Sequence, residues 1–388
     1  MRFKNTHLLL ALAAFFCTRA YAGNYEDLTK DFVYGDAGVQ SISVMSFGPE
    51  GILFLGDSKA GKIIALDMGD RTRNDSKEAF NMNDVEGKLA ALMGADPKGV
   101  VIHDMAVNPL SQNIYLAVSR ADANQLGYWK MPNDLGYATV LLRINPAGEI
   151  TQVDLGSISH SATEVPRVVR EGTENWRKSD NRTEAVTDIA YDNGQLYVAG
   201  LSNEEFASVL RIIDFPFGKQ AASYSTIEVW HVAHGKSETE APIRTLLPYE
   251  LNGEKVIIAT YTCTPFVTIP VSQLKNGQHV KSTTLGEFGF GNMPIDIIKY
   301  RNSEGHDGIL MSNMSKAVIR VKPEDILKQK TPLTEPLKDD EYTVGVHHDV
   351  LSIVGVTQID NLNEANVLLL SRMPNGSLAL RSYPTRNL

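Results

Sequence analysis

A chain of 388 residues with 43% hydrophobic and 21% charged residues is typical of a globular protein, and it is long enough for a large closed all-β domain. Its 46 acidic and 37 basic residues give a formal net charge of −9. This balance, without basic clusters, argues against partners such as nucleic acids or anionic membrane surfaces.

The first 22 residues are predicted to be a signal peptide. Arg2 and Lys4 form a basic start, residues 8–16 form an apolar core too short to span a bilayer, and Ala20–Ala22 is a small-x-small cleavage site. Cleavage makes Gly23 the first mature residue and moves the formal charge from −9 to about −12. We therefore expect a periplasmic or secreted protein that does not insert into the membrane after cleavage.

Residues 23–388 carry one repeated pattern of short alternating strands. It is clearest in residues 187–216, where Asp192-Asn193-Gly194 joins two alternating runs, as in a β-hairpin. The pattern occurs six times, and the predicted inner strands begin at Ser43, Asp104, Asp188, Arg244, Asp296 and Thr357. These repeats predict an all-β fold with a single domain, a β-propeller of six blades, with seven as the alternative. A β-sandwich would not need the same strand order six times.

The chain also offers outer strands and a means of closing the ring. Fourth strands are predicted at residues 149–155, 225–231 and 281–288. The last repeat has only three strands, so we expect the N-terminal strand Phe32–Tyr34 to complete the last blade and remove two exposed edges.

Four insertions are predicted to elaborate one face of the ring. They cover about 68–100, 120–138, 157–184 and 324–350, and lie on links between blades or on hairpins between second and third strands. Both kinds of connection emerge on the same face, and long loops on a rigid scaffold are where binding and catalysis usually occur. We therefore expect the binding site on this face, over the central channel.

Three aspartates repeat at the start of inner strands. Asp104, Asp188 and Asp296 are therefore predicted to face one another around the channel, where their oxygens would suit a hard cation such as Ca²⁺. Arg244 at a matching position could instead hold a carboxylate-bearing ligand or neutralise the aspartates. The structural alternative is that each aspartate accepts backbone N–H bonds at its own strand.

Other candidate ligand-binding residues lie on loops of the same face. They are Asp57 and Cys263 on hairpin tips, and His103 and His348 on links between blades. Cys263 is the only cysteine left after cleavage, so no intrachain disulfide can form. His231 and His234, near Glu238 and Glu240, also lie on a link and could build a transition-metal site, although the sequence lacks a known metal-binding spacing there.

Two common cofactor motifs are missing. Residues 56–62 resemble a phosphate-binding loop, but Ile63 stands where Ser or Thr would meet Mg²⁺, so no nucleotide is expected. The sequence lacks the Cys-x-x-Cys-His motif that attaches c-type haem.

The segments SFGPEGILFLGDSKAGKIIALD and DIAYDNGQLYVAGLS resemble blades of the six-bladed propeller superfamily that contains calcium-dependent lactonases and NHL-type propellers. The resemblance covers about 43–384 and implies the fold and an axial Ca²⁺ held by Asp104, Asp188 and Asp296. Arg244 departs from the ligand pattern of those families, and so does the lack of amide ligands at the matching ring positions.

Three functions follow from these patterns. The first is an exported binding protein for a small molecule, a metal ion or a protein partner. The second is a metal-dependent lactone or ester hydrolase, in which a central cation polarises a carbonyl group and His103 acts as the general base. The third is a quinone-type redox propeller, which is disfavoured because only Trp129, Trp176 and Trp230 are present.

Overall fold

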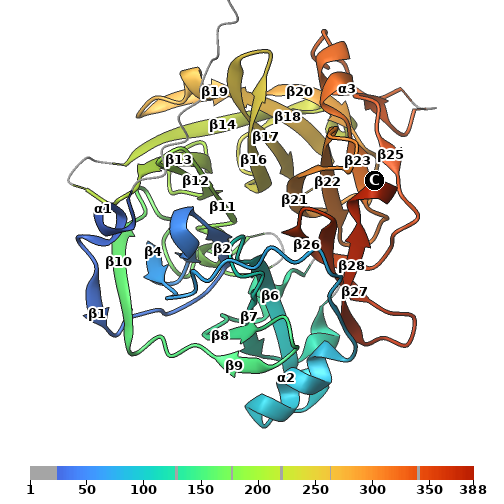
Figure 1. Ribbon diagram of the computed structural model, residues 1–388. Coiled ribbons are helices and arrows are strands. Elements are labelled where there is room, and N and C mark those ends of the chain that lie inside the picture. Colours follow the sequence, from blue (N-terminus) through green and yellow to red (C-terminus); the bar gives the residue numbers. More distant parts are fainter. Residues whose placement is uncertain (1–23, 127–129, 176–177, 219–221, 263, 339–340) are drawn as a thin grey trace, which may run out of the picture.

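A computed structural model describes residues 24–126, 130–175, 178–218, 222–262, 264–338 and 341–388. The predicted signal peptide and Cys263 lie outside these residues. Within them, six sheets, antiparallel apart from one outer parallel pair of strands, are arranged radially around a central axis (Figure 1). The prediction of an all-β propeller is confirmed, and the number of blades is six. No helix among the described residues is long and apolar enough to cross a membrane.

The blades are numbered here in chain order. In each of the first three, the innermost strand lies at the channel and the others follow outward. Blade 1 contains β2 (Val44–Phe47), β3 (Ile52–Asp57), β4 (Lys62–Asp67), β10 (Ile158–Glu164) and β1 (Val33–Gly35). Blade 2 contains β6 (Val100–Val107), β7 (Ile114–Arg120), β8 (Val140–Ile144) and β9 (Ile150–Gln152). Blade 3 contains β11 (Asp188–Asp192), β12 (Gln195–Leu201), β13 (Ser208–Asp214), β14 (Ser223–His231) and β15 (Lys236–Glu238), with β19 (Gln278–Lys281) parallel to β14.

The other three blades follow the same plan. Blade 4 contains β16 (Ile243–Leu251), β17 (Glu254–Tyr261), β18 (Pro265–Pro270), β20 (Thr283–Glu287) and β24 (Val344–Gly345). Blade 5 contains β21 (Pro294–Arg301), β22 (Asp307–Asn313), β23 (Ile319–Val321) and β25 (Asp349–Val350). Blade 6 contains β26 (Val356–Asn363), β27 (Asn366–Arg372), β28 (Leu378–Pro384) and β5 (Asn81–Met82). The helices α1 (Tyr25–Thr29), α2 (Val85–Met93) and α3 (Pro323–Lys328) lie outside the sheets. The outer strands predicted at 149–155, 225–231 and 281–288 are confirmed as β9, β14 and β20.

The hydrophobic core lies between the blades. The middle strands are apolar on both faces because each face packs against a neighbouring blade; all six residues of β3 are buried. Six apolar clusters fill the six interfaces, and each draws its residues mainly from one pair of blades. The stability of the ring therefore rests on contacts between blades.

The order of the blades around the ring differs from their order in the chain. The apolar clusters join blade 1 to blades 2 and 3, and they join blade 6 to blade 2. The ring order is therefore 1-3-4-5-6-2, and Figure 1 shows the blue strands of blade 1 between the teal blade 2 and the green blade 3. The chain completes three strands of blade 1, builds blade 2 on one side, and returns through β10 to finish blade 1.

The chain reaches this blade order through one segment, which lies on the face of the ring opposite the predicted channel mouth. Residues 68–80, here called the strap, run from blade 1 past blade 2 to blade 6. The backbone N–H of Asn74 donates to the carbonyl of Leu110 in the β6–β7 turn (2.7 Å), and the N–H of Phe80 donates to Oγ of Ser382 (2.7 Å). The prediction that the insertions elaborate only the other face is therefore wrong for the first part of 68–100.

The strap also changes how the ring is closed. It leads into β5, which pairs with β28 and gives blade 6 its fourth strand. The prediction for Phe32–Tyr34 is wrong, because β1 pairs with β10 at the outer edge of blade 1. The expectation that a strand from the N-terminal part of the chain closes the open edge of the last blade was correct. The strand that does so, β5, lies about 50 residues after Phe32–Tyr34.

Asp70 fixes the strap to blade 2. Its side chain is 9% exposed and accepts hydrogen bonds from four side chains: Asn108, Ser111, Asn113 and Tyr115. Loss of the acceptor from such a buried network costs more than loss of an exposed hydrogen bond, because the buried donors are left without a partner.

We expect Asp70→Ala to lower the free energy of unfolding by about 2–4 kcal/mol, measured as a shift of the urea midpoint. Asp75→Ala is the matched control on the same strap, because the side chain of Asp75 is 80% exposed and forms an ion pair with exposed Arg73. Equal effects of the two changes would show that the strap is not held by Asp70.

Candidate functional site

The central channel contains a cavity of about 350 Å³. All six inner strands contribute to its wall, and the insertion between β7 and β8 contributes Pro132 and Asn133 from the 3₁₀ turn η4 (Pro132–Leu135). Each inner strand is the edge of its sheet, so half of its backbone N–H and C=O groups face the channel without a partner in the sheet. The polar groups of this wall are therefore available either to neighbouring blades or to a ligand.

The three predicted aspartates do lie together on this wall. Each carboxylate accepts one bond from the N–H of the next residue in its own strand and one from the inner strand of the neighbouring blade. Asp104 binds Met105 N (2.9 Å) and Met45 N (2.5 Å). Asp188 binds Ile189 N (2.7 Å) and Leu246 N (2.6 Å). Asp296 binds Ile297 N (2.8 Å) and Ile359 N (2.9 Å). The structural alternative, in which aspartates accept backbone N–H bonds, is thus confirmed and extended across blade boundaries.

Asp360 is a fourth member of this set that the repeat pattern did not reveal. It accepts from Asn361 N (2.7 Å) and from Val107 N in blade 2 (2.7 Å), two residues further along the inner strand than the others. Residues two apart in a strand face the same side, so Gln358 and Asp360 both point to the channel. That period of two was the signal available in the sequence.

We call these four interactions the carboxylate clasps. They run in one direction around the ring, from blade 3 to 4, 5 to 6, 6 to 2 and 2 to 1. The junction of blades 1 and 3 is held differently. Nε of Arg182 donates to the carbonyl of Ser58 (2.6 Å), and Oγ of Ser58 bonds to the backbone of Val186 (3.1 Å).

β-Bulges precede the ring position in four blades. The register shifts at Ile102/Asp104, Ile243/Thr245, Pro294/Asp296 and Val356/Gln358, so one extra residue precedes the ring position. The residues structurally equivalent to Asp104 are therefore Thr245 and Gln358, not Arg244 and Thr357. In blade 1 the equivalent residue is Val44, not Ser43, because Met45 is the residue that binds Asp104.

The clustered carboxylates have raised pKa values. Burial raises the pKa of Asp296 to about 6. Burial, followed by the charge of Asp296, raises the pKa of Asp188 to about 7. For Asp360 the value is also about 7, and Asp104 shifts well above its ordinary value for the same two reasons. Their backbone hydrogen bonds oppose these shifts but do not cancel them. Full ionisation of the channel wall is therefore costly near neutral pH.

His103 and Arg244 also line the cavity, as predicted. The ring of His103 is buried, with Nδ1 at 2.6 Å from Oδ1 of Asn133 and Nε2 at 2.6 Å from Oγ of Ser119. Burial lowers the pKa of His103 to about 4. The imidazole is therefore neutral near pH 7 and connects blade 2 to the insertion over the channel mouth.

Two other predicted ligand-binding residues lie away from the channel. Asp57 is fully buried and accepts from Gln40 N (2.7 Å) and Ser41 Oγ (2.7 Å), so it holds the β3–β4 turn to the preceding loop. His348 packs on the ring of Phe288, with centroids 4.4 Å apart. The structure does not bring either residue together with His103 and Arg244.

The positions of the three aspartates can be compared with the geometry that a calcium site requires. Ca²⁺–oxygen distances of about 2.3–2.6 Å require the ligand oxygens to lie within about 5 Å of one another. In the described part of the chain, the carboxylates of Asp104, Asp188 and Asp296 do not form such a group. Both oxygens of each also already accept backbone N–H bonds. These residues do not fit one inner-sphere calcium site in this arrangement.

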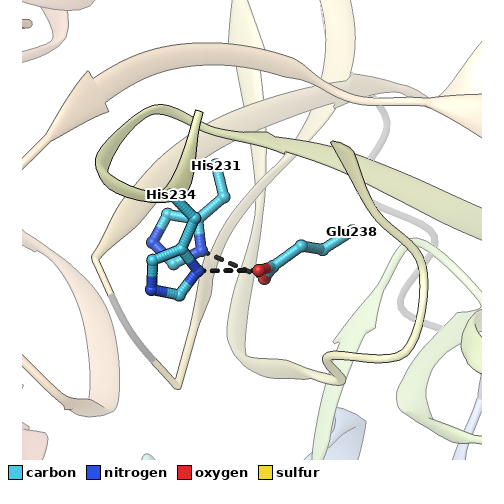
Figure 2. Close-up of side chains that lie close together, drawn as sticks. All are labelled: His231, His234 and Glu238. Carbon is cyan, nitrogen blue, oxygen red and sulfur yellow. Dashed lines mark hydrogen bonds and ion pairs between the residues drawn. The ribbon is translucent and has the colours of Figure 1, made fainter. Parts of the chain in front are cut away.

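A different set of side chains does meet this distance criterion. His231, His234 and Glu238, noted in the sequence as neighbours on a link between blades, have ligand atoms within 4.8 Å of one another (Figure 2). They lie at the outer part of blade 3, on the end of β14, on the 3₁₀ turn that follows it and on β15.

No family model matches the sequence, and no curated protein matches it. Solved structures similar to the chain include hydrazine synthase from Kuenenia stuttgartiensis, with 9% identity, coverage of 90% of this chain and 97% of that one, and a TM-score of 0.34. The dihydro-heme d1 dehydrogenase NirN shares 10% identity over 89% of this chain and 55% of its own, with a TM-score of 0.33. The extracellular domain of the putative hybrid two component system BT4673 from B. thetaiotaomicron shares 14% identity over 91% of this chain and 40% of its own, with a TM-score of 0.27.

The raised pKa values predict a specific effect of pH on stability. A carboxyl group with a folded pKa above its unfolded value keeps its proton in the folded state, so its contribution to stability falls as pH rises from about 4 to about 7. His103 opposes this trend, because its pKa is lowered. The contribution of one carboxyl group is therefore measured by comparing wild type with Asp360→Asn. Between pH 5 and pH 8, the free energy of unfolding of the variant, measured in urea, should rise by on the order of 1–2 kcal/mol relative to that of wild type.

Asp307→Asn is the control for this experiment. Asp307 pairs with exposed Arg301, which lowers the pKa of the carboxyl group, so its titration lies below this pH range. A pH dependence that is the same in wild type and in both variants would contradict the assignment.

Proposed function

We propose that this protein is an exported binding protein whose central channel holds a small ligand with a cationic group. The observation that supports it best is the convergence of four carboxylates with raised pKa values on one cavity of about 350 Å³. A propeller fold is consistent with binding of a ligand or a protein, and this cavity is large enough for a small molecule.

The electrostatics favour a cation as the recognised group. Near pH 7 the carboxyl groups are only partly ionised, because each negative charge raises the pKa of its neighbours. A bound cation within about 4–6 Å favours the ionised forms and lowers these pKa values. Binding energy therefore comes from charges that the protein has already placed on rigid strands.

The mouth of the channel supports the same proposal. Asn133 lies over the inner strands and donates to the carbonyl of Ser43 (3.4 Å), while its Oδ1 contacts His103. The insertion between β7 and β8 thus reaches the cavity, as expected for a face on which loops supply specificity. Arg244, 9% exposed on the same wall, adds a positive charge that favours a ligand with a polar or anionic part beside its cationic group.

Binding is preferred to lactone or ester hydrolysis because of His103. Both nitrogens of its ring already have hydrogen-bond partners, and its pKa of about 4 makes it a weak proton acceptor near neutral pH.

The proposal predicts stabilisation by cationic probes. In thermal unfolding, putrescine or tetramethylammonium should raise the melting temperature. At about one hundred times the Kd of the probe, the expected stabilisation is about 2.7 kcal/mol. Asp188→Asn should reduce this effect, while Asp307→Asn, at the start of β22 in blade 5 and outside the cavity wall, should leave it unchanged. Calcium chloride and sodium acetate are separate arms that distinguish a metal ion or an anion as the ligand.

Two results would contradict this proposal. One is stabilisation by acetate alone. The other is an equal response to the cationic probes in wild type and Asp188→Asn.

Export predicts a defined mature N-terminus. Intact-mass analysis of protein isolated from the periplasm of a bacterial host should show a chain that begins at Gly23. Replacing the small residue before the cleavage site, Ala22→Phe, should prevent processing, because signal peptidases require a small side chain there. Retention of the first 22 residues in wild type would contradict export through this signal.

A further inference from the structure

We propose that His231, His234 and Glu238 bind one divalent transition-metal ion of the zinc type. This site lies at the outer part of blade 3 and is separate from the channel, so the proposal does not depend on the ligand proposed there.

Local backbone geometry places the three side chains on one side of a tight reversal. Strand β14 ends at His231, the turn η6 (Val232–His234) follows, and Gly235 adopts a left-handed conformation with φ of +60°. The chain then returns as β15, in which Glu238 pairs with Val229. Val229 and His231 share one face of β14, and Glu238, directly opposite Val229, lies on that same face.

The donor atoms converge on one point. Nδ1 of His231 lies 3.0 Å from Oε2 of Glu238, and Nδ1 of His234 lies 2.7 Å from Oε1. Figure 2 shows both imidazole rings presenting Nδ1 to the same carboxylate. Zinc bonds of about 2.0–2.2 Å to nitrogen and oxygen require donors separated by about 3–3.5 Å, so small side-chain rotations would open the required space.

The two imidazole rings lie close together, with their centroids 3.7 Å apart. A single ion between their Nδ1 atoms and the carboxylate of Glu238 can therefore be shared by all three side chains.

Glu287 provides an independent observation. It is fully buried on β20 of blade 4, and its Oε2 lies 4.0 Å from Nε2 of His231, whose ring is also buried. Among the described residues, Nε2 of His231 and Oε1 of Glu287 have no hydrogen-bond partner. A histidine that binds a metal through one nitrogen commonly directs its other N–H to a carboxylate, which fixes the tautomer and the ring orientation. Glu287 is in the place for that role, so it is a positioning residue of the site.

The donor set determines the class of ion. Imidazole nitrogen suits Zn²⁺, Co²⁺, Ni²⁺ and Cu²⁺, whereas Ca²⁺ and Mg²⁺ prefer oxygen ligands alone. Three protein donors leave a fourth position of a tetrahedral ion for water. The side chain of His234 is 47% exposed, so an ion can reach the site from solvent.

The test uses the full chain without its signal segment, freed of metal by a chelator. Zn²⁺ is titrated against a chromophoric chelator, and Co²⁺ is added to report coordination geometry by its visible absorption. We expect one tight Zn²⁺ per chain and the strong absorption of four-coordinate Co²⁺. His234→Ala and Glu238→Gln should each weaken Zn²⁺ binding by about 100-fold or more, because each removes one donor. His306→Ala changes an exposed histidine on blade 5 whose side chain pairs with exposed Glu304; it is the matched control and should bind as wild type does.

Glu287→Gln separates positioning from direct binding. It should weaken Zn²⁺ by about 10- to 100-fold while the four-coordinate Co²⁺ spectrum persists. Circular dichroism checks that each variant is folded, and exposed His234 is the substitution least able to disturb the fold. The proposal is overturned if folded His234→Ala binds Zn²⁺ as tightly as wild type. It is equally overturned if wild type binds less than one Zn²⁺ per chain, because the cluster is then only a hydrogen-bonded group.

Discussion

The structure depends on how the inner edge of each sheet is satisfied. In a radial arrangement the innermost strand has a partner on one side only, and its remaining N–H groups face the channel. The carboxylate clasps supply hydrogen-bond acceptors for these N–H groups from the neighbouring blade. One aspartate side chain therefore satisfies part of an unpaired strand edge and also holds two sheets at a fixed spacing. The same solution concentrates negative charge in a small volume, and the raised pKa values are its cost. The structural role and the proposed binding role therefore reside in the same residues.

The exchange of blades 1 and 2 is a second constraint, and it is met by specific polar contacts. At the junction that the exchange creates, between blades 1 and 3, Val44 occupies the position where a clasp would stand. Arg182 and Ser58 take over its function there through backbone carbonyl and amide groups. On the other face, Asp70 anchors the strap that carries the chain past blade 2. The unusual order is thus supported on both faces of the ring.

Much of the fold could be predicted because blade repeats leave a local record in the sequence: alternating apolar residues with turn signals between them. The channel location of Asp104, Asp188 and Asp296 followed from that record. The strand that closes the ring could not be found, because β5 has two residues and no pattern of its own. The sequence pattern placed Arg244 and Thr357 at ring positions that Thr245 and Gln358 occupy, because a β-bulge adds one residue without changing the alternation around it. Glu287, behind His231, is distant in sequence and is recognised only by packing between blades 3 and 4.

The interleaving of the first two blades has a consequence for synthesis. Blade 1 remains without its fourth strand until β10, ending at Glu164, has been made, and β5 pairs with β28 of blade 6, at the far end of the chain. No early portion of the polypeptide can therefore form a finished, self-sufficient unit while it emerges from the ribosome. Under the proposed export, in which the chain is threaded unfolded through a membrane channel, this delay would favour transport, since premature compaction would block passage.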